Sequence, residues 1–208
     1  AGYEGTGTQV GVCVNGTLAG TIELHDRIKA SSAAAIARLK ELGLEPYLLT
    51  GDNTSAAQAV AREVGIAATD VQAEVMPEDK VAVVSQLQAE GKVVAMVGDG
   101  VNDAAALAQA DLGIAMGAGA DVAIEASDIT VMNNDLGSVA DSVRLARQTL
   151  RIIKGNLFWA FAYNIILIPV AAFGLLNPLF AGIAMALSSV FVVSNSLRLR
   201  KFSTQRYD

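Results

Sequence analysis

The chain has 208 residues, 52% of them hydrophobic, and its mean hydropathy of +0.42 is high for a soluble protein. Residues 1–140 hold seven lysines and arginines against 19 aspartates and glutamates, whereas residues 141–208 hold eight against two. The single cysteine, Cys13, excludes a disulfide within the chain. The division of charge means that an acidic part of the chain is joined to a basic part. Because its basic residues flank the most apolar stretch, they favour a membrane surface over nucleic acid as the partner.

The N-terminal residues predict a β-hairpin. Ala1–Glu4 holds neither an initiator methionine nor a signal peptide, so we expect a fragment of a longer protein. Gln9–Val14 and Thr17–Glu23 then alternate around Asn15-Gly16, which is a strong signal for a two-residue hairpin turn. A helix is expected next, over Ala30–Leu42, because its apolar residues recur at helical spacing.

The middle of the chain alternates between apolar runs and helical patterns. We expect strands over Leu44–Leu49, Val93–Val97, Leu112–Met116 and Ile129–Met132. Helices are expected over Thr54–Val64, from Met76 onward, after Asn102-Asp103 and near Asp121–Ala126. This order predicts a doubly wound parallel α/β domain.

Polar residues follow two of these expected strands, at the edge of the sheet where α/β proteins bind ligands. Thr50-Gly51-Asp52 offers a hydroxyl and a carboxylate ahead of a helix N-terminus, which suits an oxyanion. Ordinary capping by Asp52 or Asn53 explains the same residues.

A second group, Gly98–Asp103, holds two carboxylates four residues apart, which are hard oxygen ligands suited to Mg²⁺. A tight turn with Asp103 as a helix cap is the alternative. The full string Gly-Asp-Gly-Val-Asn-Asp favours a metal and phosphate site. Lys80 stands near the expected start of a helix, where a cation is unfavourable. A bound phosphate would explain it, and so would an ordinary surface lysine.

The C-terminal third predicts a transmembrane hairpin. Helical periodicity begins at Leu136, and 43 uncharged residues separate Lys154 from Arg198. Asn177-Pro178 divides them into Phe158–Leu176 and Leu179–Leu197, each about 28 Å long as a helix and close to the thickness of a bilayer core. Basic residues flank both ends, so the positive-inside rule places these ends and the α/β domain in the cytoplasm.

The polar residues of the hairpin are candidate ligands. Asn164 lies about two turns inside the first span and should face the bundle interior. Met185, Ser188 and Ser189 share one face near the middle of the second span. Helix-packing serines and a gap-filling methionine are the alternative interpretation.

These motifs together resemble a known family. Thr-Gly-Asp-Asn (50–53), Pro-Glu-Asp-Lys (77–80) and Gly-Asp-Gly-Val-Asn-Asp (98–103) resemble the phosphorylation domain of P-type ATPases, which has a haloacid-dehalogenase-like fold. Tyr163-Asn164, and Met185 with Ser188-Ser189, resemble the last two membrane helices of the copper(I)-exporting subgroup. The resemblance covers nearly the whole chain, and its soluble and membrane motifs are independent of one another.

The resemblance implies an ATP-driven pump for Cu(I) and Ag(I) that works through an aspartyl phosphate. It implies that Thr50, Gly51 and Asp52 surround the phosphoryl group, that Lys80 neutralises its oxygens and that Asn102 bonds nearby. Asp99 and Asp103 would hold Mg²⁺. The resemblance also implies which residues surround the transported Cu(I), either as direct ligands or as neighbours that contact a ligand: Tyr163, Asn164, Met185, Ser188 and Ser189. No residue is assigned to ATP itself.

The resemblance also implies a domain plan and partners. Residues 1–23 would end the nucleotide-binding domain, 24–140 form the phosphorylation domain and 141–208 form the linker helix and transmembrane hairpin, with spans at about 156–176 and 179–197. The expected partners are membrane lipid, the missing N-terminal part of the polypeptide and a cytosolic copper chaperone. No nucleic acid is expected. The expected location is a bacterial plasma membrane.

The chain departs from the family pattern in one decisive respect. It has no Asp-Lys-Thr-Gly-Thr, so the aspartate that accepts the phosphoryl group is missing and the fragment should be inactive alone. Ala105 also stands where the family usually has proline. A non-catalytic membrane-anchored accessory protein of the same fold, or a pump for another transition metal, stays open as an alternative.

Overall fold

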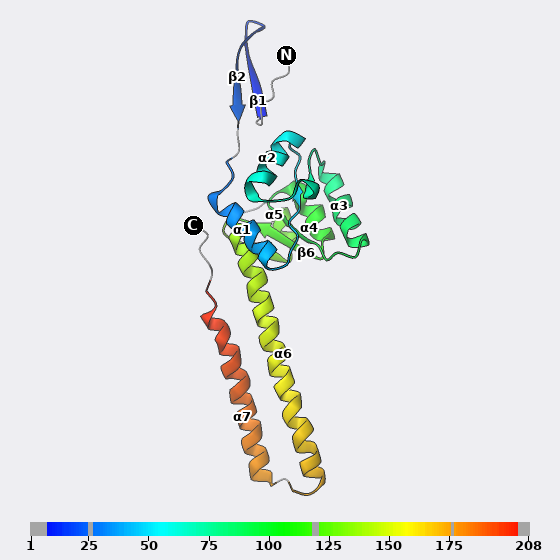
Figure 1. Cartoon of the computed structure of the whole chain (residues 1–208), viewed down its shortest axis with the longest axis vertical. Helices are drawn as coiled ribbons and strands as arrows, with labels where there is room; N and C mark the ends of the chain where they lie inside the picture. Colours follow the sequence, from blue (N-terminus) through cyan, green and yellow to red (C-terminus); the bar gives the residue numbers. More distant parts are fainter. Residues whose placement is uncertain (1–7, 25–26, 118–120, 176, 204–208) are drawn as a thin grey trace. The chain divides into compact units, whose positions relative to one another are not determined.

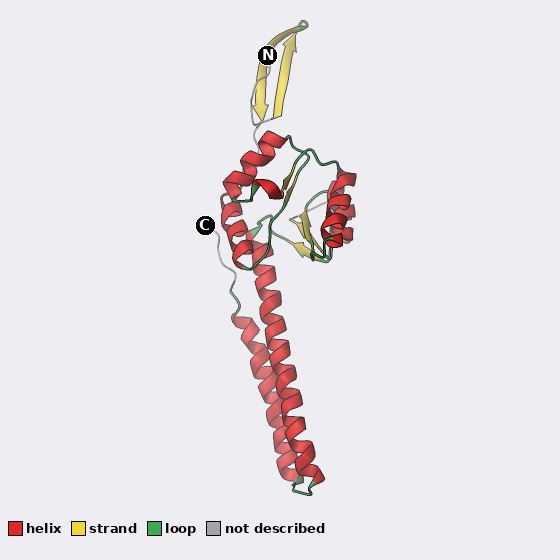
Figure 2. Cartoon of the chain, turned by 45° about the vertical axis from the view of Figure 1, so that its right-hand side comes forward, coloured by secondary structure: helices red, strands yellow, loops and turns green. Residues whose placement is uncertain are grey.

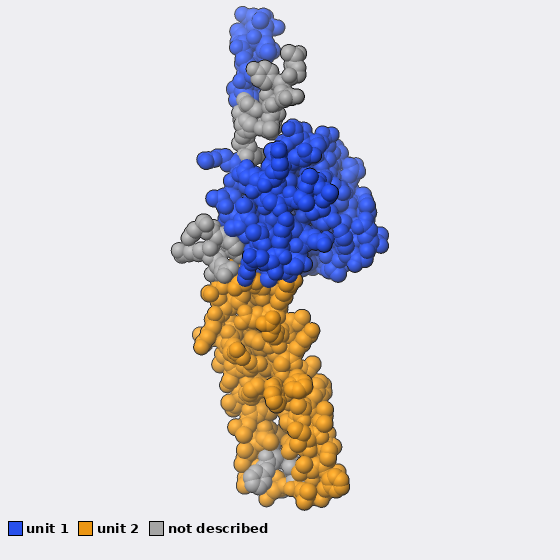
Figure 3. All heavy atoms as spheres, in the orientation of Figure 1, with its two compact units in different colours: residues 1–140, 206–208 blue, residues 141–205 orange. Residues whose placement is uncertain are grey.

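The computed structural model describes residues 8–24, 27–117, 121–175 and 177–203. It contains two compact units, one within residues 1–140 and one within residues 141–205 (Figure 3). The first unit holds the mixed α/β part, and the second holds most of two long helices (Figure 1).

An antiparallel hairpin begins the described chain. Strands β1 (Thr8–Val14) and β2 (Thr17–Leu24) are joined by Asn15 and Gly16, whose φ angles are 52° and 78°. Positive φ at both central residues is what a two-residue turn of this kind requires, and Asn-Gly is the pair that adopts it most readily. The predicted hairpin is therefore confirmed.

The α/β domain alternates helices with short strands (Figure 2). In chain order its elements are α1 (Ala30–Glu41), β3 (Leu48–Leu49), α2 (Thr54–Val64), the 3₁₀ turn η1 (Ala68–Asp70), β4 (Val71–Gln72), α3 (Pro77–Ala89), β5 (Ala95–Gly98), η2 (Val101–Asp103), α4 (Ala104–Gln109), β6 (Leu112–Met116), α5 (Asp121–Glu125) and β7 (Ile129–Val131). All paired strands of this domain are parallel: β3 pairs with β4, and β6 lies between β5 and β7. The predicted parallel α/β fold is confirmed, with its sheet in two pieces.

Buried apolar residues link the two sheet pieces. One cluster packs α1 and α2 together, with Leu48 and Val71 of the β3–β4 pair against it. Another is built on Ile114 and Met116 of β6 and Val131 of β7. Leu136 packs against both clusters, so the residue just before α6 joins the two halves of the domain.

Two predicted strands are shorter than expected. The strand expected over Leu44–Leu49 is reduced to β3, because Gly43 turns with a φ of 76° and Pro46 fixes its own φ and has no N–H to donate. The strand expected over Val93–Val97 begins at Ala95 and ends at Gly98, and Val93 is 88% exposed. The short strand β4 was not predicted, since two residues carry too little pattern.

The second unit consists mainly of α6 (Gly137–Ala172), α7 (Pro178–Ser196) and the 3₁₀ turn η3 (Leu197–Lys201). Two helices in the described chain are long and apolar enough to cross a membrane, within Gly137–Ala172 and Gly182–Lys201. Helix α6 ends at Ala172, because Gly174 takes a left-handed φ of 70°. The end of the first predicted span, at 176, lies outside the described residues, and the bounds of the span stay a prediction. Pro169 lies within α6 and does not end it.

Candidate functional site

The first candidate group follows β3. Thr50 N–H donates to Gln72 O (3.0 Å) and Val75 N–H donates to Thr50 O (3.0 Å), which extends the parallel pairing beyond β3 and fixes the Thr50 backbone. The Thr50 hydroxyl donates to Asp52 Oδ2 (2.8 Å) and accepts from Asp52 N–H (3.1 Å). Gly51 lies between them, and a Cβ there would be in ordinary contact with Val75 O at 3.6 Å. The hydroxyl and carboxylate therefore form one polar group at the end of the strand.

The residue that caps α2 is Asn53, not Asp52. Asn53 Oδ1 accepts a hydrogen bond from Ala56 N–H at 2.9 Å, which satisfies one of the free N–H groups of the first turn. Capping thus accounts for Asn53. The exposed Asp52 carboxylate accepts from the Thr50 hydroxyl two positions earlier and, among the described residues, from no other side chain, which leaves it in position to face a ligand.

The second group joins α3 to the end of β5. Lys80 Nζ lies 2.7 Å from Asp103 Oδ1, and the two side chains are only 16% and 13% exposed. Asp103 does occupy the N-cap position of α4, as the capping alternative expected, but its side chain makes no capping hydrogen bond and pairs with Lys80 instead. Lys80 is likewise not an ordinary surface lysine. Its charge is stabilised in the first turn of α3 by a carboxylate that lies 23 positions later in the sequence.

Gly98 gives the Asp103 side chain its space. A Cβ built on Gly98 would lie 2.7 Å from Asp103 Cβ and 2.8 Å from Asp103 Oδ2, closer than real Cβ contacts allow. Asp103 N–H donates to Gly100 O at 3.1 Å, which folds the chain back over the end of β5. Asp99 and Asn102, the other predicted residues of this loop, are exposed. The loop therefore combines one nearly buried, paired carboxylate with one open to solvent.

These two groups stand at the carboxyl ends of different strands, β3 and β5. Across the described ranges, no hydrogen bond or ion pair connects Thr50 or Asp52 to Lys80 or Asp103. Nor does the described part of the chain hold a cluster of three or more histidines, cysteines or carboxylates suited to a metal. The pair Asp99 and Asp103 nevertheless suits Mg²⁺, which binds through one or two carboxylates and completes its shell with phosphate and water.

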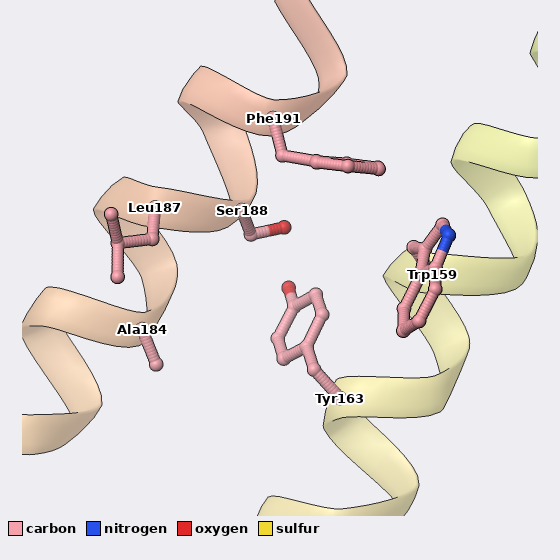
Figure 4. Close-up of a pocket in the computed structure, with 6 residues that line it drawn as sticks. All are labelled: Trp159, Tyr163, Ala184, Leu187, Ser188 and Phe191. Carbon is pink, nitrogen blue, oxygen red and sulfur yellow. The ribbon is translucent and has the colours of Figure 1, made fainter. Parts of the chain in front are cut away.

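The membrane-type helices contain a separate candidate site. Tyr163 and Ser188 line a pocket of about 290 Å³ between α6 and α7, together with Trp159, Ala184, Leu187 and Phe191. Figure 4 shows the Tyr163 and Ser188 side chains converging on this space from the two helices. Trp159 meets Phe191 edge to face, with ring centroids 6.0 Å apart. The sequence interpretation did not include these two aromatic residues, although Trp159 lies one helical turn before Tyr163.

The other predicted ion-site residues lie outside this pocket. Asn164 is exposed, and its amide donates to Ala160 O of its own helix at 2.7 Å. The described helices thus do not place Asn164 against α7. Ser189 donates to Met185 O at 3.2 Å, also within one helix, and Met185 is 63% exposed. Only two of the five predicted residues are therefore brought together by this pair of helices.

Comparison with known proteins gives consistent matches. A family model described as haloacid dehalogenase-like hydrolase matches residues 2–111, and a second with the same description matches residues 80–143. The chain is 54% identical over 190 residues to a copper-exporting P-type ATPase of Bacillus subtilis, covering 91% of this chain and 23% of that protein. It is 56% identical over 195 residues to a probable copper-exporting P-type ATPase V of Mycobacterium tuberculosis, covering 94% of this chain and 25% of that protein.

A solved structure extends the likeness to three dimensions. The crystal structure of a zinc-transporting PIB-type ATPase in an E2.Pi state superposes with a TM-score of 0.82 at 39% identity, covering 93% of this chain and 32% of that one. The chain spans about a quarter of the length of the curated relatives described above.

Proposed function

This chain belongs to the haloacid dehalogenase-like hydrolase family, and on that basis we propose that it is the phosphorylation and C-terminal membrane part of an ATP-driven P-type pump that exports Cu(I). The observation that carries the proposal is the Lys80–Asp103 pair at the end of β5. Phosphoryl transfer asks a protein mainly for positioning and for neutralisation of charge, and this pair holds a cation in place for that task. Relatives that match more than 90% of the chain are named copper-exporting P-type ATPases.

In this proposal each polar residue acts on a phosphoryl group. The Thr50 hydroxyl and its backbone orient the phosphoryl oxygens, with Gly51 and Asp52 completing the turn, and Lys80 neutralises oxygen charge. Asn102, exposed beside β5, donates an amide hydrogen bond to the same region. Asp99 and Asp103 would hold Mg²⁺, which when bound adds further neutralisation of the phosphoryl oxygens.

We propose that the phosphoryl acceptor comes from the rest of the polypeptide. Within the described residues, β3 pairs only with β4 and β5 pairs only with β6, so each parallel strand leaves one edge without a backbone partner. The Tyr47 hydroxyl and Lys92 Nζ, which precede these two strands, lie 2.8 Å apart. We propose that a further parallel strand pairs with the open edges of β3 and β5, so that its carboxyl end carries an aspartate to the site formed by Thr50 and Lys80.

The N-terminal hairpin supports the same conclusion. An isolated two-stranded hairpin is marginally stable in water. Val10, Val12 and Ile22 expose 40–54% of their surface, and Val10 is paired directly with Ile22. A face of this kind is normally covered, and we propose that the nucleotide-binding part of a longer polypeptide covers it. ATP would bind mainly to that part.

We propose that α6 and α7 cross a bacterial plasma membrane and that the α/β domain is cytoplasmic. Support comes from the length and apolarity of the two helices, from the cations beyond both ends and from the bacterial origin of the relatives described above. A cytosolic protein that delivers Cu(I) is then a suitable partner. Nucleic acid is not, because the cations flank an apolar stretch.

The proposed cargo is Cu(I), with Ag(I) as a chemical equivalent. A soft monovalent ion prefers the thioether of Met185, with Tyr163, Asn164, Ser188 and Ser189 as neighbours that orient it. The structural relative transports zinc, a divalent ion that needs compensating negative charge at membrane depth. Helix α7 has no carboxylate in its sequence, which favours Cu(I) over Zn²⁺.

The test is to assay the complete protein in its membrane. We expect ATP hydrolysis that depends on Cu(I) or Ag(I), together with an acid-stable phosphoenzyme that Lys80→Ala abolishes. Lys92→Ala is the matched control, because Lys92 is an exposed cation of the same domain that pairs with Glu45 and Tyr47. Stimulation by Zn²⁺ and not by Cu(I) would overturn the cargo. A normal phosphoenzyme in Lys80→Ala would overturn the site.

A further inference from the structure

Helices α6 and α7 are joined by a short chain of side-chain hydrogen bonds. Asn156 Nδ2 donates to Ser196 Oγ at 3.1 Å, and Asn195 Nδ2 donates to Asn156 Oδ1 at 2.8 Å. All three side chains are partly buried between the helices. We call this group the amide clamp. Each hydrogen bond connects a residue of α6 to a residue of α7. The clamp therefore fixes the register of the two helices along their axes, with Asn156 beside Asn195 and Ser196.

The clamp brings two cationic segments to the same level. Arg151 and Lys154 precede Asn156 by five and two residues on α6, and Arg198 follows Asn195 by three residues. Arg198 also donates to Asn195 Oδ1 at 3.4 Å, so it is connected to the clamp itself. The next turn, η3, adds Arg200 and Lys201.

A second contact holds the end of η3 against α6. The Arg144 guanidinium lies 5.2 Å from the centre of the Phe202 ring and pairs with Asp141 at 2.7 Å. Arg144 is therefore already engaged, while its contact with Phe202 keeps the neighbouring cations of η3 close to α6.

Four cations of these segments have no carboxylate partner among the residues that the structure describes. Arg151, Lys154, Arg200 and Lys201 are exposed, and within the described part of the chain no carboxylate lies within ion-pair distance of them. Arg151 and Lys154 are three positions apart and so share one face of α6. The structure thus gathers unpaired positive charge from two helices at one end of the hairpin.

We propose that these cations form a binding site for the headgroup of an anionic phospholipid. The inference rests on the proposed membrane placement of α6 and α7. The uncharged stretch begins directly after Lys154 and ends directly before Arg198, so the cations lie at the boundary between hydrocarbon and water. Lipid phosphates lie at this depth, and a cluster of basic residues beside a transmembrane helix attracts anionic headgroups.

The single tryptophan offers a direct readout. Trp159 is five residues after Lys154 on α6, about 7.5 Å deeper along the helix, and is 55% exposed. Lipids brominated on their acyl chains quench tryptophan fluorescence on contact. The full chain is reconstituted in mixed bilayers in which either phosphatidylglycerol or phosphatidylcholine carries the bromine. We expect Trp159 to report about fivefold enrichment of phosphatidylglycerol over phosphatidylcholine.

Three variants test the site. Arg151→Gln with Lys154→Gln and Arg200→Gln should lower the enrichment to within about twofold. Arg27→Gln with Lys40→Gln and Arg62→Gln removes the same charge from exposed positions of the other unit and should leave it unchanged. Arg151→Lys with Arg200→Lys keeps the charge and should preserve it. Quenching by brominated phosphatidylcholine confirms that each variant is inserted.

Four results would overturn the proposal. They are equal quenching by the two lipids, an enrichment that the triple glutamine variant keeps, an equal loss in the control variant, and displacement of phosphatidylglycerol by millimolar inorganic phosphate. Displacement by inorganic phosphate would show that the cations bind a soluble anion and not a lipid headgroup. Absence of quenching by either lipid would instead show that α6 is not in the bilayer, which removes the membrane placement together with the lipid site.

Discussion

Lys80 Nζ and Asp103 Oδ1 lie 2.7 Å apart and connect the first turn of α3 to the residue that precedes α4. Because both side chains are largely buried, removing one partner leaves the other charge poorly compensated. We predict that Lys80→Ala destabilises α3 and β5 by about 1–3 kcal/mol. Hydrogen exchange of the amides in these elements measures the change.

The matched control for this substitution is Glu41→Gln. It breaks the Arg38–Glu41 pair, in which Glu41 is 63% exposed. Exposed pairs contribute little, so we expect less than about 0.5 kcal/mol. If Lys80→Ala changed protection no more than Glu41→Gln, the Lys80–Asp103 pair would have no structural role.

A second prediction concerns Gly98. In Gly98→Ala the new methyl group would stand 2.7 Å from Asp103 Cβ, so the Asp103 side chain must move away from Lys80. We expect a loss of about 1–3 kcal/mol, typical of an overpacked site, and failure of the complete protein to form its phosphoenzyme. Phosphorylation assays and hydrogen exchange measure the two effects.

Substitutions at two other glycines serve as controls, because they distinguish displacement of the Asp103 side chain from general overpacking. Gly113→Ala would clash with Leu107 O at 2.7 Å, and the three atoms nearest the new methyl group belong to Leu107 and Ala126 and not to Asp103, so it should cost stability without specific loss of the Lys80–Asp103 contact. Gly20→Ala meets nothing within 4 Å and should change neither property. A Gly98→Ala protein that forms its phosphoenzyme at the normal rate would contradict the arrangement around Asp103.

Local signals in the sequence predicted some elements to the residue. Helix α2 begins and ends as expected, because Asn53 caps its N-terminus and Gly65 takes a left-handed φ of 81° after its last residue. Strand β6 also has its predicted bounds, since its run of buried residues stands between two helices. The ends of these elements are determined by residues next to them in the sequence, so the sequence pattern alone can predict them.

Features that depend on distant residues could not be predicted in the same way. The sequence identified Lys80 and Asp103 separately but assigned the lysine to phosphate, since nothing local indicates that the two side chains pair. Strand β5 is shorter than its apolar run because Val93 has no strand-pairing partner in the described chain. An apolar run in the sequence does not show which of its residues will pair with another strand. The amide clamp likewise joins residues 39 and 40 positions apart.

A third prediction concerns pH and Asp111. The pKa of this carboxyl lies below its ordinary value of 3.8, chiefly because Val94 N–H donates to it (2.8 Å), with the Gln88 amide as a second cause. A lowered pKa in the folded state means that the carboxylate stabilises the fold above pH 3.8 and that this contribution disappears as the pH falls through the lower, folded value.

Asp111→Asn should therefore flatten the acid dependence of stability below about pH 4. Val94 directly precedes β5, so the exchange rate of its N–H as a function of pH is the measurement. Glu41→Gln removes one exposed carboxylate elsewhere and serves as control. An unchanged acid profile in Asp111→Asn would show that the Val94 bond does not couple to folding.

The last prediction concerns the cargo. Met185 is the only sulfur in α7 and is 63% exposed, so a third helix of the complete protein can reach it. If Met185 is a Cu(I) donor, Met185→Ala should raise the Cu(I) and Ag(I) concentrations for half-maximal ATP hydrolysis together, by about tenfold or more. Ser189→Ala should change them less, because a hydroxyl suits a soft ion poorly and this one bonds to Met185 O. Val190→Ala, a control on the same helix at a position that is 61% exposed and does not line the pocket of Tyr163 and Ser188, should leave the ion dependence unchanged. Equal shifts in all three variants would mean that α7 packing, and not the Met185 thioether, determines the ion dependence.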